Sequence, residues 1–265
     1  MIRDITLGQY YNTASIVHKL DARVKLFGTL IFLISLFVST SIYAYIIAFI
    51  FLIVVILLSN VPIHFVVRGI KALIPLIVMS MFFNLLFTPG EVVFNASFIN
   101  ITKEGIEISI KMCVRLLFLV TGSSILTLTT TPSRLTDGIE SSLGFLKIFK
   151  VPIAEIALMM SIALRFIPIL IEEVGKIMDA QTARGADFET GGIIKKAKAF
   201  IPLLVPLFIS AFRRADDLAL AMEARCYTTS DIRTKYNPLK YGRRDYNAYV
   251  IILLYLILMI CTKFI

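Results

Sequence analysis

The sequence predicts an all-α integral membrane protein with about five transmembrane helices and two long helices at the cytoplasmic boundary of the membrane. Hydrophobic residues make up 58% of the 265 residues and charged residues only 17%, whereas a soluble protein is roughly half apolar and about a quarter charged. The charges also avoid five long apolar runs. With a few flanking residues, each run reaches the length of ~17–25 residues that crosses a ~30 Å hydrocarbon core.

The N-terminal transmembrane region, residues 1–131, holds four of the five predicted spans. They lie at about 24–40, 42–59, 70–88 and 111–131. Only Ser39, Thr40 and Ser41 separate the first two, and a single helix through both would be far longer than the bilayer is thick. We therefore predict a tight helical hairpin at these three residues. The last predicted span occupies residues 247–265.

The basic residues predict the orientation. The N-terminal segment, the 59–71 loop and the 132–246 region are rich in Lys and Arg, whereas the 88–107 loop has more acidic than basic residues. Because basic loops stay inside, the N-terminus and 132–246 are expected in the cytoplasm. The basic stretch at 232–246 is expected to attract the anionic headgroups of the lipid bilayer. Without a recognition fold, the positive charge does not indicate nucleic acid.

The 132–246 region is predicted to contain two long helices, at about 152–185 and 193–227. Both are apolar in their first half and polar in their second half. The first holds Glu155 and Arg165 within its apolar half, and an unpaired charge at mid-bilayer costs several kcal/mol. The apolar half of the second is too short for an ordinary span and contains two prolines. We therefore expect both helices to lie along the inner boundary of the membrane.

The two long helices end in similar sequences, "AQTARGAD" at 180–187 and "AMEARCYT" at 221–228. Alanines three residues apart leave a smooth helix face, and the following arginine presents a five-donor fork suited to carboxylates and carbonyls. This pattern predicts docking of a soluble partner. The predicted docking residues are Ala183, Arg184, Gly185, Ala224, Arg225 and Cys226. The alternative is that each arginine only complements the dipole of its helix.

Catalytic functions have little support in the sequence. No Gly-x-x-x-x-Gly-Lys-[Ser/Thr] motif is present, so the chain cannot bind ATP in the P-loop manner. Two histidines and three cysteines without a CxxC spacing do not indicate a metal site. We expect no catalytic, cofactor-binding or metal-binding residue. A secondary transporter, and a membrane transferase that uses Asp216 and Asp217, stay as alternatives.

The segment at 8–32, "GQYYNTASIVHKLDARVKLFGTLIF", resembles the entry of the transmembrane T component of energy-coupling factor (ECF) transporters. That family has a Ser…His-x-Leu-Asp-x-Arg-x-Lys run before its first span. Here the run consists of Ser15, His18, Leu20, Asp21, Arg23 and Lys25. The two Ala-Arg sequences also resemble the two Ala-Arg-Gly motifs of the family. From its chemistry, Asp21 is expected to cap the first span, and a plain membrane-interface anchor is the alternative for the segment.

The resemblance implies a non-enzymatic subunit in a prokaryotic plasma membrane. In such transporters the T component holds two cytosolic ABC-type ATPase subunits, which bind the ATP, through its two coupling helices. It also contacts a membrane S component that captures a vitamin or a transition-metal ion. Arg184 and Arg225 would each enter a groove on one ATPase. Cys226 stands where the family has Gly, and because a left-handed cap is harder for Cys, the exit of the chain after Arg225 is expected to differ.

Overall fold

A computed structural model of the chain describes residues 10–38, 41–96, 99–186, 188, 192–227 and 239–262, without the side chains of 92–101, 146–147 and 193–199. The chain divides into two compact units. We call residues 8–153 and 239–265 the membrane unit. Residues 154–238, with 1–7, form the second, crossed-helix unit.

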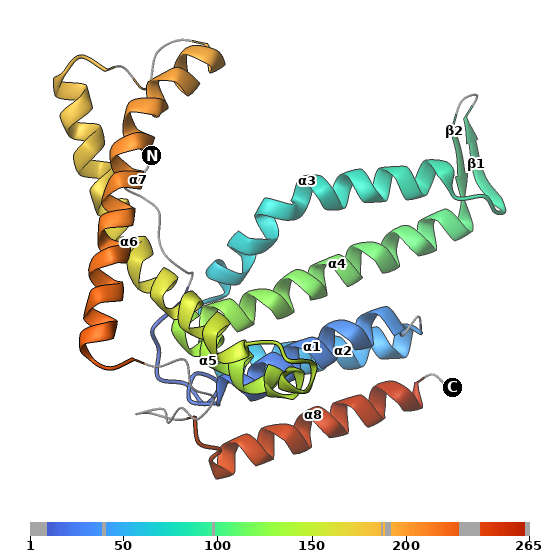
Figure 1. Ribbon diagram of the computed structural model, residues 1–265. Coiled ribbons are helices and arrows are strands. Elements are labelled where there is room, and N and C mark those ends of the chain that lie inside the picture. The colour runs from blue at the N-terminus through green and yellow to red at the C-terminus, as the bar shows by residue number, and fades with distance from the viewer. Residues whose placement is uncertain are drawn as a thin grey trace. The chain divides into compact units, whose positions relative to one another are not determined.

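The membrane unit consists mainly of long helices (Figure 1). These are α1 (Ala22–Val38), α2 (Ile42–Ser59), α3 (Ile63–Phe87), α4 (Lys103–Thr129) and α8 (Arg243–Cys261). A short helix α5 (Pro132–Ser142) and a 3-10 helix η2 (Leu143–Phe149) follow α4. Helices α1 and α2 pack against each other, and both contact α4 and α8.

The fold class predicted from the sequence is confirmed. In the described part of the chain, five helices are long and apolar enough to cross a membrane: α2, α3, α4, α8 and α6 (Ile153–Ala183). The number of candidate spans equals the predicted five, but α6 is among them in place of α1. Helix α1 has 17 residues, at the lower limit for a span. Helix α6 has the length and composition of a span, so its placement at the inner boundary stays a prediction that rests on its charges.

A small β-hairpin, which the sequence analysis did not predict, connects α3 and α4. Strands β1 (Val92–Ala96) and β2 (Ile99–Thr102) are antiparallel and lie at the tip of the α3–α4 pair (Figure 1). The Thr102 hydroxyl accepts a hydrogen bond from the Gly105 amide at 3.1 Å and thereby caps α4. The same hydroxyl donates to the Thr88 carbonyl just after α3 at 2.9 Å. The hairpin therefore ends directly in the α4 cap.

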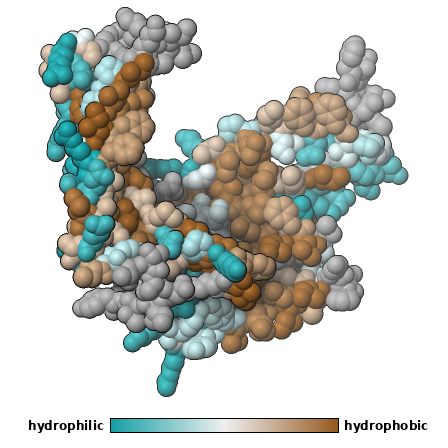
Figure 2. All heavy atoms as spheres, viewed as in Figure 1, coloured by the Kyte–Doolittle hydropathy of each residue, from teal (hydrophilic) through white to brown (hydrophobic). Residues whose placement is uncertain are grey.

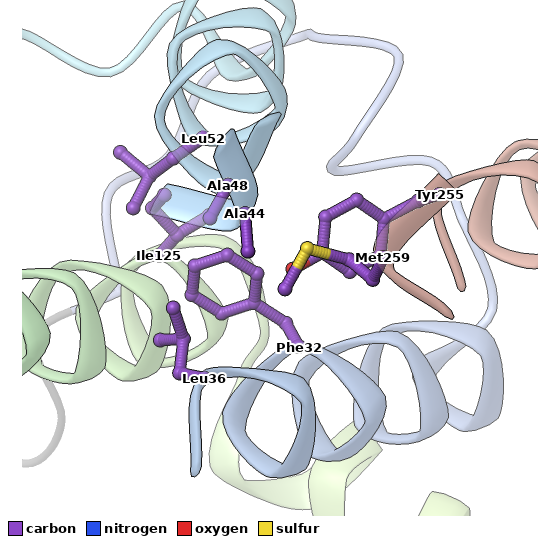
Figure 3. Close-up of a cluster of buried hydrophobic side chains, with 8 residues drawn as sticks. All are labelled: Phe32, Leu36, Ala44, Ala48, Leu52, Ile125, Tyr255 and Met259. Atoms are coloured by element: carbon purple, nitrogen blue, oxygen red, sulfur yellow. The ribbon is translucent and has the colours of Figure 1, made fainter. Parts of the chain in front are cut away.

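The core of the membrane unit joins four helices (Figure 3). The buried residues are Phe32 and Leu36 of α1, Ala44, Ala48 and Leu52 of α2, Ile125 of α4, and Tyr255 and Met259 of α8. Ala44 and Ala48 are one turn apart, and small side chains let neighbouring helices approach closely. The Tyr255 hydroxyl lies 2.7 Å from the Ser35 hydroxyl, so its polar end is satisfied. The four helices thus form one packed group.

The outer surface of this helix group is strongly apolar. Figure 2 shows hydrophobic side chains over α3, α4 and α8. On α2, the large side chains of Phe49, Ile50 and Leu57 are more than half exposed. Large contiguous apolar surfaces are rare on soluble monomers. Because the lipid hydrocarbon is as apolar as these side chains, this surface is suited to a bilayer.

The N-terminal segment, residues 10–21, closes the end of α4. The Tyr11 amide donates to the Leu128 carbonyl at 2.9 Å. The Lys25 ammonium at the start of α1 donates to the Thr129 carbonyl at 2.8 Å. The last carbonyls of a helix have no partner within the helix. The segment therefore satisfies orphan groups of α4 while it leads into α1.

His18 holds this segment in shape as a neutral side chain. Its Nε2 donates to the Tyr11 carbonyl at 2.9 Å, and its Nδ1 accepts from the Ser15 hydroxyl at 2.6 Å. This assignment follows because a carbonyl can only accept, and a neutral imidazole has one donor and one acceptor. Burial lowers the pKa of His18 from its ordinary 6.5. The neutral form is therefore the one that this site favours.

Asp21 caps α1, as predicted from its position before the first span. Its carboxylate accepts the Arg23 amide at 2.9 Å and pairs with the Arg23 guanidinium at 3.2 Å. The Asp21 amide donates in turn to the buried Asp245 carboxylate of α8 at 2.8 Å. The Ser…His-x-Leu-Asp-x-Arg-x-Lys run is therefore a structural junction of α1, α4 and α8.

The crossed-helix unit contains α6 and α7 (Ile193–Ala224). Each helix has prolines only in its first part, Pro168 in α6 and Pro202 and Pro206 in α7. Proline removes a backbone hydrogen bond and bends a helix. The two helices cross each other near their middle (Figure 1). The second half of each helix is free of proline and runs uninterrupted to its end.

Candidate docking site

Helix α6 ends in a Schellman motif. Gly185 has a positive φ of 87°. Its amide donates to the Thr182 carbonyl at 2.9 Å, and the Ala186 amide donates to the Gln181 carbonyl at 3.0 Å. These are the two bonds that define this cap. Arg184 is the residue at which the helix stops, and its backbone lies within the loop that both bonds close.

Helix α7 ends in the same way. Cys226 has a positive φ of 55°. Its amide donates to the Glu223 carbonyl at 2.8 Å, and the Tyr227 amide donates to the Met222 carbonyl at 3.0 Å. The expectation of a different exit after Arg225 was therefore wrong. The two cap bonds outweigh the cost of a left-handed conformation at a residue with a Cβ, about 1–2 kcal/mol.

All six predicted docking residues are exposed: Ala183, Arg184 and Gly185 on α6, and Ala224, Arg225 and Cys226 on α7. Among the described residues, neither arginine forms an ion pair. Each guanidinium therefore keeps its donors available to another molecule. The alanine beside each arginine adds little bulk, so an approaching surface can come close to the backbone.

An ion pair joins α6 and α7 where they cross. The Arg214 guanidinium lies 3.2 Å from the Glu173 carboxylate. The two residues are 41 positions apart, the same offset that relates Arg184 to Arg225. Each arginine tip thus lies eleven residues, about three helical turns, beyond the crossing. This pair was not predicted from the sequence, although the repeat offset of 41 residues, applied to Glu173, leads to Arg214.

An apolar pocket of about 300 Å³ lies beside the crossing, between α6 and α7. Phe166 and Leu170 line it from α6, and Ala215, Leu218 and Ala219 line it from α7. The two alanines leave room between the helices. A pocket of this size lies at the small end of the range that proteins use for ligands, about 300–1,000 Å³.

The two caps allow a direct test of the left-handed position. Replacing Cys226 with Gly relieves the Cβ strain, and replacing Gly185 with Ala introduces it, each by about 1 kcal/mol. We expect hydrogen exchange in the last turn of α7 to slow about fivefold in Cys226→Gly, and that of α6 to accelerate about fivefold in Gly185→Ala.

Gly175→Ala is the matched control for the second change. Gly175 lies inside α6 with open space around its Cα, so an added methyl group should slow exchange there. Faster exchange at the end of α7 in Cys226→Gly would contradict the interpretation of this cap.

The described helices define a multi-pass, all-α membrane protein whose two crossed helices end in matched, exposed arginines. Residues 13–236 match the family described as "Cobalt transport protein". The chain belongs to this family, as a transmembrane T component of the energy-coupling factor type.

Curated relatives cover nearly the whole chain. Three of them carry the description "Energy-coupling factor transporter transmembrane protein EcfT". The protein of Ruminiclostridium cellulolyticum is 49% identical over 245 residues, 92% of each chain. That of Clostridium kluyveri is 48% identical over 250 residues, 94% of this chain and 93% of the relative. That of Lactococcus lactis subsp. cremoris is 42% identical over 260 residues, 98% of each.

Proposed function

We propose that this chain is the coupling subunit of an importer, linking two cytosolic ABC-type ATPases to a membrane S component that binds a vitamin or a transition-metal ion. The observation that carries the proposal is the duplication of one exposed arginine cap on two crossed helices. Two equal docking points suit two similar soluble subunits. The relatives, described as transporter transmembrane proteins, support the same role.

In this proposal Arg184 and Arg225 dock on the ATPases. Each guanidinium would meet carboxylates or carbonyls at the surface of one ATPase. When ATP closes the ATPase pair, the two tips move and the motion passes along the proline-free halves to the crossing at Glu173 and Arg214. The apolar first halves of α6 and α7 would then shift the S component.

The chain itself would hydrolyse no ATP in this scheme. The partner subunits bind and hydrolyse the nucleotide, and the S component selects the substrate. The proposed location is a prokaryotic plasma membrane, with the N-terminus and residues 132–246 in the cytoplasm. This orientation rests on the distribution of Lys and Arg.

The test is to purify the tagged chain from its native membranes and to identify the co-purifying subunits. We expect two ATPase subunits and one small membrane protein, and ATP-dependent uptake after the complex is reconstituted in liposomes. Uptake by the chain alone, with no ATPase present, would instead establish a secondary transporter.

A further inference from the structure

The membrane unit contains a second apolar cavity, distinct from the pocket of the crossed helices. It has a volume of about 280 Å³ and lies among α1, α2, α4 and α8. Its innermost residues are Val24, Phe32, Leu52, Ile125 and Ile252. A dry cavity of only ~150 Å³ between apolar side chains is enough to hold benzene. This cavity therefore has room for a segment of hydrocarbon chain.

The cavity opens on the apolar outer surface of the helix group. Val54 and Leu58 of α2 and Ile251 of α8 line it and are 45%, 42% and 53% exposed. These side chains form the rim, while the innermost residues are buried. In a bilayer, the medium at this rim is lipid hydrocarbon. A lipid chain can therefore enter the cavity from the side.

One end of the cavity is basic. Lys25 in the first turn of α1 and Arg244 in the first turn of α8 line this end, with Asn247 beside them. The Lys25 ammonium donates to the Thr129 carbonyl at 2.8 Å and, more weakly, to the His18 carbonyl at 3.4 Å. An ammonium has three protons, so one remains for another acceptor. Arg244 is exposed and has no ion-pair partner among the described residues.

Within the described residues, the nearby carboxylates form no ion pair with Lys25 or Arg244. Asp21 pairs with the Arg23 guanidinium at 3.2 Å. Asp245 is buried, and its two oxygens accept the Asp21 and Gly242 amides at 2.8 Å each. Both carboxylates are thus already engaged inside the protein. Arg244 and the third proton of Lys25 stay available at the cavity end.

We propose that this cavity is a binding site for one anionic phospholipid, with an acyl chain between α2 and α8 and the phosphate at Arg244 and Lys25. An apolar body with a cationic end matches a molecule that has a hydrocarbon chain and a negative headgroup. The proposal goes beyond general attraction to the bilayer because it assigns one lipid to one site. It is independent of ATPase docking.

The purified, delipidated full chain allows a test by native mass spectrometry. The probes are dioleoyl-phosphatidylglycerol and dioleoyl-phosphatidylcholine, which share their acyl chains and differ in net charge. We expect one tightly retained phosphatidylglycerol per chain, with an affinity about tenfold above that of phosphatidylcholine. Arg244→Gln should lower the affinity about fivefold, and Arg244→Lys should largely restore it.

Matched controls separate the site from general charge and from misfolding. Arg243 is exposed and does not line the cavity, so Arg243→Gln should leave retention unchanged. Ala248 lines the cavity, and Ala248→Phe should fill it and abolish tight retention. Val250 is 64% exposed and outside the cavity, so Val250→Phe should have no effect.

Three results would overturn the proposal. Equal retention of the two lipids would show that the site does not recognise an anionic headgroup. If Arg243→Gln lowered the affinity for phosphatidylglycerol as much as Arg244→Gln does, the lipid would be held by nonspecific charge attraction. Unchanged retention of phosphatidylglycerol in Ala248→Phe would show that the lipid does not occupy this cavity. Because the assay contains neither ATPase nor S component, failure here leaves the proposed coupling function untouched.

Discussion

The double variant Arg184→Glu/Arg225→Glu is expected to lose co-purification with the ATPases and, with it, ATP-dependent uptake. Each substitution replaces a five-donor cation with an anion at an exposed cap. Arginine at the centre of an interface often contributes about 2 kcal/mol or more. Loss of both arginine contacts therefore lowers the affinity of the chain for the ATPase pair about a thousandfold. Quantitative pull-down of the tagged chain with the two ATPases measures this change.

The single variants and one control sharpen this experiment. Arg184→Glu or Arg225→Glu alone should weaken one ATPase contact and leave the other. Arg213 is an exposed arginine of α7 that lies close to the crossing rather than at the tip, so Arg213→Glu should co-purify normally. Wild-type co-purification of the double variant, with normal folding by gel filtration, would exclude the docking role of the caps.

The second large effect is expected at the crossing of α6 and α7. In Glu173→Arg two cations face each other, and in Arg214→Glu two anions do. The pair is partly exposed, so the ion pair itself contributes only up to ~1 kcal/mol, but like charges at the same position push the helices apart. We expect each single variant to lower ATP-dependent uptake about tenfold, equivalent to ~1.4 kcal/mol, with ATPase binding retained.

Exchange of the two charges provides the decisive comparison. Glu173→Arg/Arg214→Glu restores opposite charges across the crossing, so uptake should recover to within about threefold of the wild type. Glu172 is the exposed neighbour of Glu173, and Glu172→Arg should have little effect. If the double reversal were as impaired as the single variants, the pair would not set the geometry of the crossing.

Two of the helices begin well before the membrane spans predicted within them. Helix α3 begins at Ile63 rather than near residue 70, and α4 at Lys103 rather than near 111. Hydropathy detects only the apolar part of a helix. The hydrogen-bonded ladder continues into polar turns, as in the first three turns of α4, where the Lys111 ammonium lies 2.6 Å from the Glu107 carboxylate.

Other features depend on contacts that no local pattern reveals. The bond from the Asp21 amide to Asp245 joins residues 224 positions apart, and the β-hairpin has strands of only five and four residues. The arginine positions at the helix ends were found because they repeat. The cap at Cys226 was not predicted. The reluctance of a residue with a Cβ to adopt a left-handed conformation argued against it, whereas the two backbone hydrogen bonds that favour this conformation are visible only in the structure.

The equal distances from the crossing to the two arginines have a mechanical consequence. Eleven residues of uninterrupted helix make each arm about 16 Å long. If the helices pivot at Glu173 and Arg214, a rotation of each arm by about 10° displaces its arginine by about 3 Å, because the displacement is the arm length multiplied by the angle. In the proposed complex, two arms of the same length would turn a symmetric closure of the two ATPases into equal displacements at both arginines, so neither ATPase would have the longer lever.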